Sequence, residues 1–220
     1  MMQPPHYRRL EALRALEEPI ILLVGGATGT GKSTVATEAA YRLGITRFTS
    51  TDFIRETIRA YFPLPEMPLV HVSSFEAEGA GGSSEAGFLE QTGRVLVGVE
   101  AAINRALNEG WSMVIEGVHL VPGLVPTEIE GVLLVHAVLH VDDIEQHRRH
   151  FAIRDASTGG ERALDRYLTR LAEIRALQDV IVDRAARYGV PAIESSNIER
   201  ATTAVIDLVL SSAAALEPIV

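Results

Sequence analysis

The sequence predicts an α/β fold in which a parallel sheet is covered by helices on both faces. Three observations support this: an apolar run follows a short polar lead, a glycine-rich turn follows that run, and short β-branched runs then alternate with helical stretches. Right-handed crossovers make a doubly wound, three-layer sandwich the expected arrangement. The 220 residues can bury one sizeable core, so we expect a single domain over residues 1–220.

Five short runs are predicted to form the sheet. They are rich in apolar or β-branched residues and cover 20–24, 47–50, 111–115, 132–141 and 191–194. The first run is apolar throughout, as expected for a central strand covered on both faces. Helices are predicted over 33–43, ending at Gly44, and over about 161–188, where leucine and isoleucine recur at helical spacing. A brief helical lead is expected within residues 1–18.

Composition excludes several classes of protein. The chain has no cysteine, which removes disulfides and thiolate chemistry, and no apolar run reaches the roughly 18 residues of a membrane span. A net charge of −9 disfavours binding to nucleic acid, because such binding depends on neutralising many phosphates. We therefore expect a cytoplasmic protein that binds a small anionic molecule and neither nucleic acid nor membrane. Its oligomeric state is not indicated.

The glycine-rich turn matches the pattern G-x-x-x-x-G-K-[ST] in full. Glycines at these positions let backbone N–H groups approach phosphate oxygens, and the helix that follows points its positive dipole end at the anion. The motif predicts a P-loop nucleotide-binding fold that takes ATP and Mg²⁺. The predicted nucleotide-binding residues are Gly26, Ala27, Thr28, Gly29, Thr30, Gly31, Lys32, Ser33 and Thr34.

Lys32 is the only lysine among the twenty Lys and Arg residues of the chain. A compact ammonium fits a narrow phosphate cradle better than a planar guanidinium does, so we expect Lys32 to bridge the β- and γ-phosphates as a catalytic residue. The absence of a second lysine also rules out an N-K-x-D motif for reading guanine.

Two carboxylates follow predicted strands and are candidates for the chemistry. Asp52 comes after the second strand and is predicted to orient the acceptor hydroxyl and take its proton, while a helix cap at Thr51 or Asp52 is the alternative. Glu116 ends a buried strand and is predicted to hold Mg²⁺ through water, together with the Ser33 hydroxyl. Arg55 is predicted to grip an acidic group of the acceptor. His119 is predicted either to reach the acceptor or to lie in a surface loop.

Two segments do not fit the alternation of strands and helices. Residues 62–87 contain several prolines and a glycine-serine run, and residues 148–162 combine basic residues with a short break at 154–160. Beside a phosphate loop they predict a mobile acceptor-side insert and a lid, with a linker-like surface loop as the alternative. Arg149 and Arg154 are the predicted lid cations, against simple pairing on a helix surface.

The order of these motifs resembles that of the 2-phosphoglycerate kinases. The resemblance extends from Ile20 to about Ile206 and rests on residues 25–34, 50–56, 71–76, 114–123, 147–149 and 173–178. The first of these segments is generic to P-loop proteins, whereas His71–Glu76 and Val114–Gly123 are much more particular. Similar archaeal members often carry an added N-terminal regulatory domain. Fewer than twenty residues precede the first predicted strand here, so the resemblance does not imply that regulation.

The resemblance implies ATP- and magnesium-dependent phosphorylation of 2-phosphoglycerate to 2,3-bisphosphoglycerate. It implies a fold like that of the nucleoside-monophosphate kinases, with His71, Ser73 and Ser74 as donors to a doubly anionic acceptor. Two alternatives remain. One is a kinase of another small acid or of a 5′-hydroxyl nucleic acid, since Asp-x-x-Arg after the second strand looks similar there. The other is a nucleotide-binding regulator that turns over no acceptor.

Overall fold

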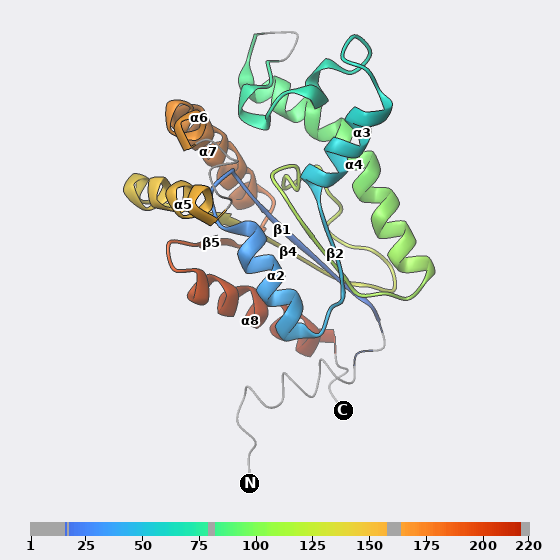
Figure 1. Cartoon of the computed structure of the whole chain (residues 1–220). Helices are drawn as coiled ribbons and strands as arrows, with labels where there is room; N and C mark the ends of the chain where they lie inside the picture. The colour runs from blue at the N-terminus through green and yellow to red at the C-terminus, as the bar shows by residue number, and fades with distance from the viewer. Residues whose placement is uncertain (1–15, 17, 79–81, 158–163, 217–220) are drawn as a thin grey trace.

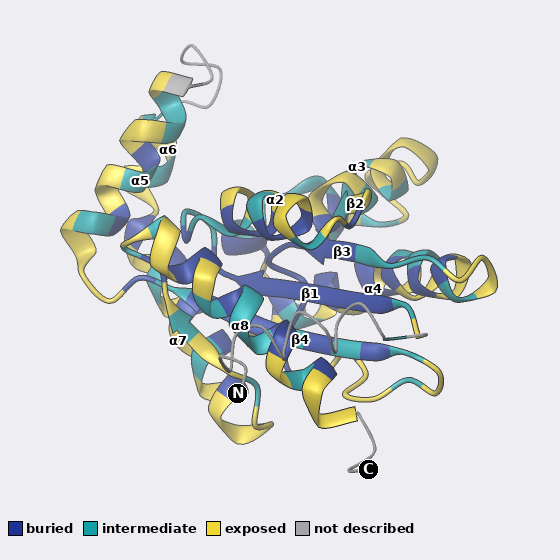
Figure 2. Cartoon of the chain, turned by 90° about the horizontal axis from the view of Figure 1, so that it is seen from below, coloured by how far each residue is buried: buried dark blue, intermediate teal, exposed yellow. Residues whose placement is uncertain are grey.

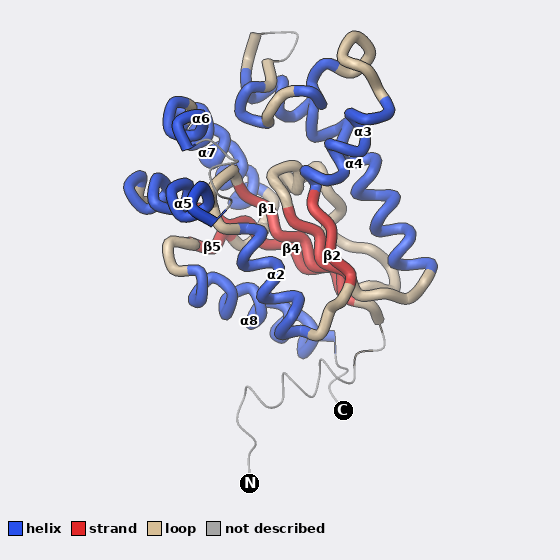
Figure 3. Tube along the Cα trace, viewed as in Figure 1, coloured by secondary structure: helices blue, strands red, loops and turns tan. Residues whose placement is uncertain are grey.

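The computed structural model describes residues 16, 18–78, 82–157 and 164–216 of the 220-residue chain. The helical lead predicted over residues 1–18 lies almost entirely outside these residues, as do positions 79–81 of the insert and 158–162 of the lid region. Within the described residues, helices lie on both faces of one sheet and form three layers with it (Figures 1 and 3).

Five parallel strands form the sheet in the described part of the chain, in the order β2-β3-β1-β4-β5. The central strand β1 (Ile20–Gly26) lies between β3 (Met113–Glu116) and β4 (Leu133–His140). The edges are β2 (Arg47–Ser50) and β5 (Ala192–Glu194). The predicted five-stranded parallel sheet is confirmed.

Successive residues of β1 face opposite helical layers. Leu22 and Val24 join a core cluster with α2 (Lys32–Leu43) and α8 (Ile198–Leu216). Leu23 joins a second cluster with α4 (Ser84–Asn108). All seven residues of β1 are buried, and Figure 2 shows the strand as a dark band between helices with exposed outer faces. This burial on both faces explains why the run is apolar without alternation.

One long helix predicted over about 161–188 is two helices. α6 (Leu164–Thr169) and α7 (Leu171–Arg187) are separated at Arg170, whose φ of −106° and ψ of 18° leave the helical region. The buried apolar stripe belongs to α7 alone, whereas α6 contacts α5 (Ile144–Ser157). Leucine spacing cannot reveal this break, because both helices carry apolar residues in the same phase.

The described parts of the insert and of the lid region contain more regular structure than their composition predicts. The described residues of 62–87 include two 3₁₀ helices, η1 (Pro68–His71) and η2 (Ser74–Glu76), and the first turn of α4, which the Ser83 side chain caps. The break predicted from residue 154 is also wrong as far as residue 157, because α5 continues through it. Together with α3 (Thr51–Tyr61), the insert lies beyond the carboxyl ends of the strands (Figure 1).

No helix within the described residues is long and apolar enough to cross a membrane.

The two-sided burial of β1 yields a stability prediction. Leu22 is 0% exposed, so Leu22→Ala leaves a cavity and should lower the free energy of unfolding by about 3 kcal/mol. Val97 on α4 is 68% exposed, and Val97→Ala should change it by no more than about 0.5 kcal/mol. Urea unfolding of both variants measures the difference, and equal losses would contradict the assignment of β1 to the core centre.

Candidate active site

The glycine-rich turn joins the end of β1 to the start of α2, and its glycines are required by space and by backbone angle. Gly29 and Gly31 have φ values of 85° and 80°, in the left-handed region. A Cβ at Gly26 would lie 2.3 Å from the Leu139 carbonyl oxygen of β4. The loop is therefore held tightly against the sheet, as a backbone cradle for an anion requires.

Lys32 folds back into this loop. Its ammonium donates a hydrogen bond to the Ala27 carbonyl oxygen at 2.9 Å, and the Thr30 hydroxyl donates to the same oxygen at 3.0 Å. Burial lowers the pKa of Lys32, against the opposing attraction of Glu116 and Asp52. The single lysine of the chain is thus desolvated at the loop, with both predicted carboxylates near enough to influence it.

Ser33 and Glu116 are brought together as predicted. The Ser33 hydroxyl donates to Glu116 Oε1 at 3.0 Å, and Glu116 is 7% exposed at the carboxyl end of β3, next to β1. A hydroxyl and a carboxylate are the hard oxygen ligands that suit Mg²⁺. The described residues contain no group of three or more His, Cys, Asp or Glu side chains that could hold a metal. The pair therefore fits an ion that takes its remaining ligands from phosphates and water.

Asp52 lies in the first turn of α3 and does not cap it. The cap is Ser50, whose hydroxyl accepts a hydrogen bond from the Phe53 amide at 3.1 Å, so the alternative of a cap at Thr51 or Asp52 is wrong. The Asp52 side chain is 66% exposed, and the Arg55 guanidinium is 3.8 Å away. Its carboxylate is therefore accessible to a molecule from solvent.

Arg55 is bound by the insert rather than left open to a ligand. Its guanidinium donates to the carbonyl oxygens of Val70 at 2.9 Å and Val72 at 3.1 Å, and pairs with Glu56 at 2.8 Å. The prediction that Arg55 grips the acceptor directly does not fit these contacts, which give it a positioning role. It fixes the backbone on both sides of His71.

His119 is fully buried and is not the surface-loop residue that was one expectation. Its Nδ1 lies 2.9 Å from the Thr51 hydroxyl and its Nε2 lies 2.9 Å from Gln91 Oε1. The Gln91 amide donates to the carbonyl oxygens of Leu69 and Val72. Because both ring nitrogens are used inside the protein, His119 does not reach an acceptor either. It links the start of α3, beside Asp52, to the insert.

The predicted acceptor donors lie on the insert in different surroundings. His71 Nε2 is 2.9 Å from the Phe62 carbonyl oxygen, and Ser74 is buried. The Ser73 hydroxyl accepts a hydrogen bond from Arg166 of α6 at 3.0 Å, and the same guanidinium nitrogen contacts Glu76 at 2.7 Å. Of the three, Ser73 lies beside a cation.

The predicted lid arginines lie on α5. Arg149 is exposed, and Arg154 lies over the Tyr167 ring, 5.5 Å from its centroid. The phosphate loop is contacted instead by two histidines of this helix, His147 and His150, through the carbonyl oxygens of residues 28 and 29. The basic cluster in the sequence pointed to this helix as part of the site, but the prediction selected its arginines and missed its histidines.

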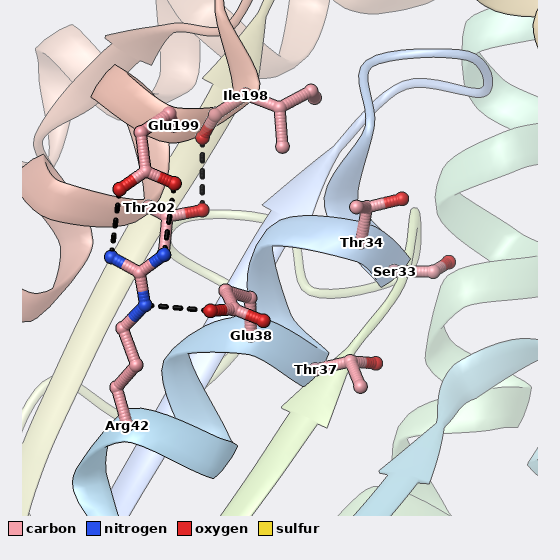
Figure 4. Close-up of a pocket in the computed structure, with 8 residues that line it drawn as sticks. All are labelled: Ser33, Thr34, Thr37, Glu38, Arg42, Ile198, Glu199 and Thr202. Carbon is pink, nitrogen blue, oxygen red and sulfur yellow. Dashed lines mark hydrogen bonds and ion pairs between the residues drawn. The ribbon is translucent and has the colours of Figure 1, made fainter.

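An open pocket of about 670 Å³ adjoins the phosphate loop (Figure 4). It lies between α2 and α8, and Arg42 crosses it by pairing with Glu38 at 2.6 Å and Glu199 at 2.8 Å. Its lining residues are Ser33, Thr34, Thr37, Glu38, Arg42, Ile198, Glu199 and Thr202.

The strand order, the phosphate loop and the helices beyond the carboxyl ends of the strands define a P-loop kinase fold. The solved shikimate kinase of Acinetobacter baumannii, in complex with shikimate, has the same fold. The similarity has a TM-score of 0.51 at 20% sequence identity and covers 90% of this chain and 97% of that one.

Curated relatives narrow the class to a family. The chain is 38% identical to the 2-phosphoglycerate kinase of Methanothermobacter thermautotrophicus, covering 94% of this chain and 69% of the relative. It is 37% identical to that of Thermococcus kodakarensis, covering 88% and 67%. The chain therefore belongs to the 2-phosphoglycerate kinase family. It spans 65% of the length of the Methanopyrus kandleri relative, to which it is 36% identical. No protein-family model matches the sequence.

The buried histidine predicts a pH dependence of stability. Burial lowers the pKa of His119 to about 4, against 6.5 for an ordinary histidine, and His136 and His147 are lowered to about 4 as well. Between pH 6.5 and 4 the unfolded chain binds more protons at these histidines than the folded chain does. Their contribution to the free energy of unfolding is therefore fully present above pH 6.5 and is lost as the pH drops toward 4.

The free energy of unfolding of His119→Gln should fall less steeply over this range than that of the wild-type chain, because one of the three histidines is gone. The two slopes should differ by up to about 1.4 kcal/mol per pH unit. Urea unfolding from pH 4 to pH 7.5 measures both slopes. Identical slopes in the variant and the wild-type chain would show that His119 is not held neutral by burial.

Proposed function

We propose that the chain transfers the terminal phosphoryl group of ATP to the free hydroxyl of 2-phosphoglycerate, giving 2,3-bisphosphoglycerate and ADP. The observation that carries this proposal is the gathering of Lys32, the Ser33–Glu116 pair and Asp52 at the carboxyl ends of β1, β3 and β2. Membership of the 2-phosphoglycerate kinase family supports the choice of acceptor.

The residues divide the chemistry between them. Asp52 orients the acceptor hydroxyl and accepts its proton as the oxygen bonds to the γ-phosphorus and the bond to the bridging oxygen of ADP breaks. Lys32 exchanges its hydrogen bond to the Ala27 carbonyl for phosphate oxygens. Ser33 and Glu116 would hold magnesium, which neutralises charge on the phosphates when bound. The triphosphate lies on the amides of the loop, and the pocket beyond Thr34 has room for the nucleoside.

The acceptor side is built from the insert and the lid. 2-Phosphoglycerate carries a carboxylate and a phosphate, so its site requires cations and hydrogen-bond donors. Ser73 and Arg166 lie together at 3.0 Å, and His71 lies on the same segment, which Arg55 and Gln91 fix through its backbone. Ser74 is buried and would act through its backbone, while Arg149 and Arg154 supply further charge from the lid helix.

A cytoplasmic location belongs to the proposal, and the absence of cysteine is compatible with it. The net charge of −9 favours a small acceptor over an oligonucleotide.

The acceptor is tested by following ADP release with ATP and magnesium across 2-phosphoglycerate, 3-phosphoglycerate, glycerate and a 5′-hydroxyl oligonucleotide. The proposal predicts turnover with 2-phosphoglycerate and formation of 2,3-bisphosphoglycerate. Turnover with the oligonucleotide alone would replace it by a nucleic-acid kinase. Nucleotide binding without acceptor-dependent ADP release would make the chain a regulator.

The proton acceptor is tested by Asp52→Asn. The amide cannot take the proton, so kcat should fall by about 10²- to 10⁴-fold while the Kd for ATP changes little. Asp183→Asn, at an exposed position of α7, is the matched control and should keep wild-type kcat. If Asp52→Asn instead lost ATP affinity with an intact fold, Asp52 would belong to the nucleotide side of the site.

A further inference from the structure

Three consecutive carbonyl groups of the phosphate loop are held from outside the loop. His147 Nε2 lies 2.8 Å from the Thr28 carbonyl oxygen, and His150 Nδ1 lies 2.9 Å from the Gly29 carbonyl oxygen. The Ser195 hydroxyl, which follows β5, lies 2.7 Å from the Thr30 carbonyl oxygen. Two of these residues come from one turn of α5 and the third from the segment that follows β5.

A carbonyl oxygen can only accept a hydrogen bond, so the proton in each contact belongs to the side chain. The ring nitrogen that faces the loop therefore carries a proton in each histidine, Nε2 in His147 and Nδ1 in His150. The single proton of the Ser195 hydroxyl is shared with a second acceptor, the His140 carbonyl oxygen at 2.9 Å. Burial lowers the pKa of His147 to about 4, which keeps its ring neutral near pH 7. Within the described residues, His147 Nδ1 is buried and has no hydrogen-bond partner. The orientation of the ring therefore satisfies Nε2, which contacts the loop, and leaves Nδ1 buried without a partner among the described residues.

The peptide bonds of the described residues are trans, so each N–H points away from the C=O of the same peptide plane. When the carbonyls of residues 28, 29 and 30 face outward onto side chains, the amides of Gly29, Thr30 and Gly31 face the opposite way. Successive N–H groups that point to one side form an anion-binding nest. The side-chain contacts to the three carbonyl oxygens therefore determine the direction in which the amides of residues 29–31 point.

We propose that His147 and His150 are positioning residues that hold the phosphate loop in its anion-binding orientation, with Ser195 supporting the next peptide plane. The ligand class is a polyphosphate anion. This inference deepens the proposed nucleotide site and rests on it, but it does not depend on the identity of the acceptor.

The packing around Gly29 supports this assignment. A Cβ at Gly29 would lie 2.5 Å from Cζ of Phe151 and 2.8 Å from Nε2 of His147, so α5 fits directly against the loop backbone. His147 also stacks on Phe151, with ring centroids 5.1 Å apart and planes at 14°. The imidazole is therefore held by ring packing as well as by its hydrogen bond, and it has little freedom to release the loop.

Paired substitutions separate positioning from packing. His147→Leu and His150→Leu remove the donor, whereas His147→Gln and His150→Asn place an amide N–H near the lost Nε2 and Nδ1. Arg148→Ala is the control on the same helix, because Arg148 is exposed and pairs with Glu145 at 2.7 Å. Titration calorimetry with inorganic tripolyphosphate and with ATP plus magnesium measures Kd, and the KM for 2-phosphoglycerate is measured in parallel.

Each leucine variant should weaken tripolyphosphate and ATP alike by about five- to tenfold, the effect of losing roughly one hydrogen bond. The amide variants should recover most of this loss, and Arg148→Ala and the acceptor KM should not change. Unchanged Kd values in folded leucine variants, or equal losses in leucine and amide variants, would overturn the proposal. If His147→Leu does not fold, the half-buried His150 decides the question.

The outcomes also separate this inference from the proposed function. If the wild-type chain binds tripolyphosphate and ATP but does not phosphorylate 2-phosphoglycerate, the acceptor assignment fails and the positioning role is still decided by the variants. If the wild-type chain binds neither, both proposals fail.

Discussion

The site depends on one constraint, which is the orientation of the backbone between β1 and α2. A turn of two glycines and small residues has few side chains to hold its shape, so its carbonyl groups must be fixed by the rest of the fold. The sheet supplies a wall at Leu139, α8 supplies Ile198 against Gly31, and α5 and the segment after β5 supply side-chain donors. The doubly wound sheet matters to function because it brings these distant segments to one edge.

The same contacts connect the phosphate loop to the acceptor side. The rings of His147, Phe151 and Tyr167 form a continuous stack, with centroid separations of 5.1 and 5.0 Å. Tyr167 of α6 also lies 6.1 Å from Phe75 of η2, and its neighbour Arg166 contacts Glu76. A second connection runs through buried Thr51, His119 and Gln91. The insert and the phosphate loop are therefore joined by a continuous chain of packed and hydrogen-bonded side chains.

The sequence predicts the features that local pattern determines. The apolar run before the glycine motif identified β1, and a carboxylate at the end of a buried strand placed Glu116 beside Ser33, since parallel strands end at one edge. The features that the sequence did not predict depend on packing between residues far apart in the chain. Nothing local shows that Arg55 turns toward the insert or that His119 is buried. The cluster at 147–150 drew attention to the segment that forms α5, but only the rotation of this helix against the loop decides that the histidines face inward and Arg149 outward.

Lys32 allows a direct test of the central claim, because it is the only lysine of the chain. An amine-reactive reagent followed by mass spectrometry can modify Lys32 and the N-terminal amine, and the latter serves as an internal control. Magnesium and ATP should protect Lys32 strongly and the N-terminal amine not at all, inorganic tripolyphosphate should also protect Lys32, and adenosine should not. Equal labelling of Lys32 with and without ATP would show that the loop does not hold the triphosphate.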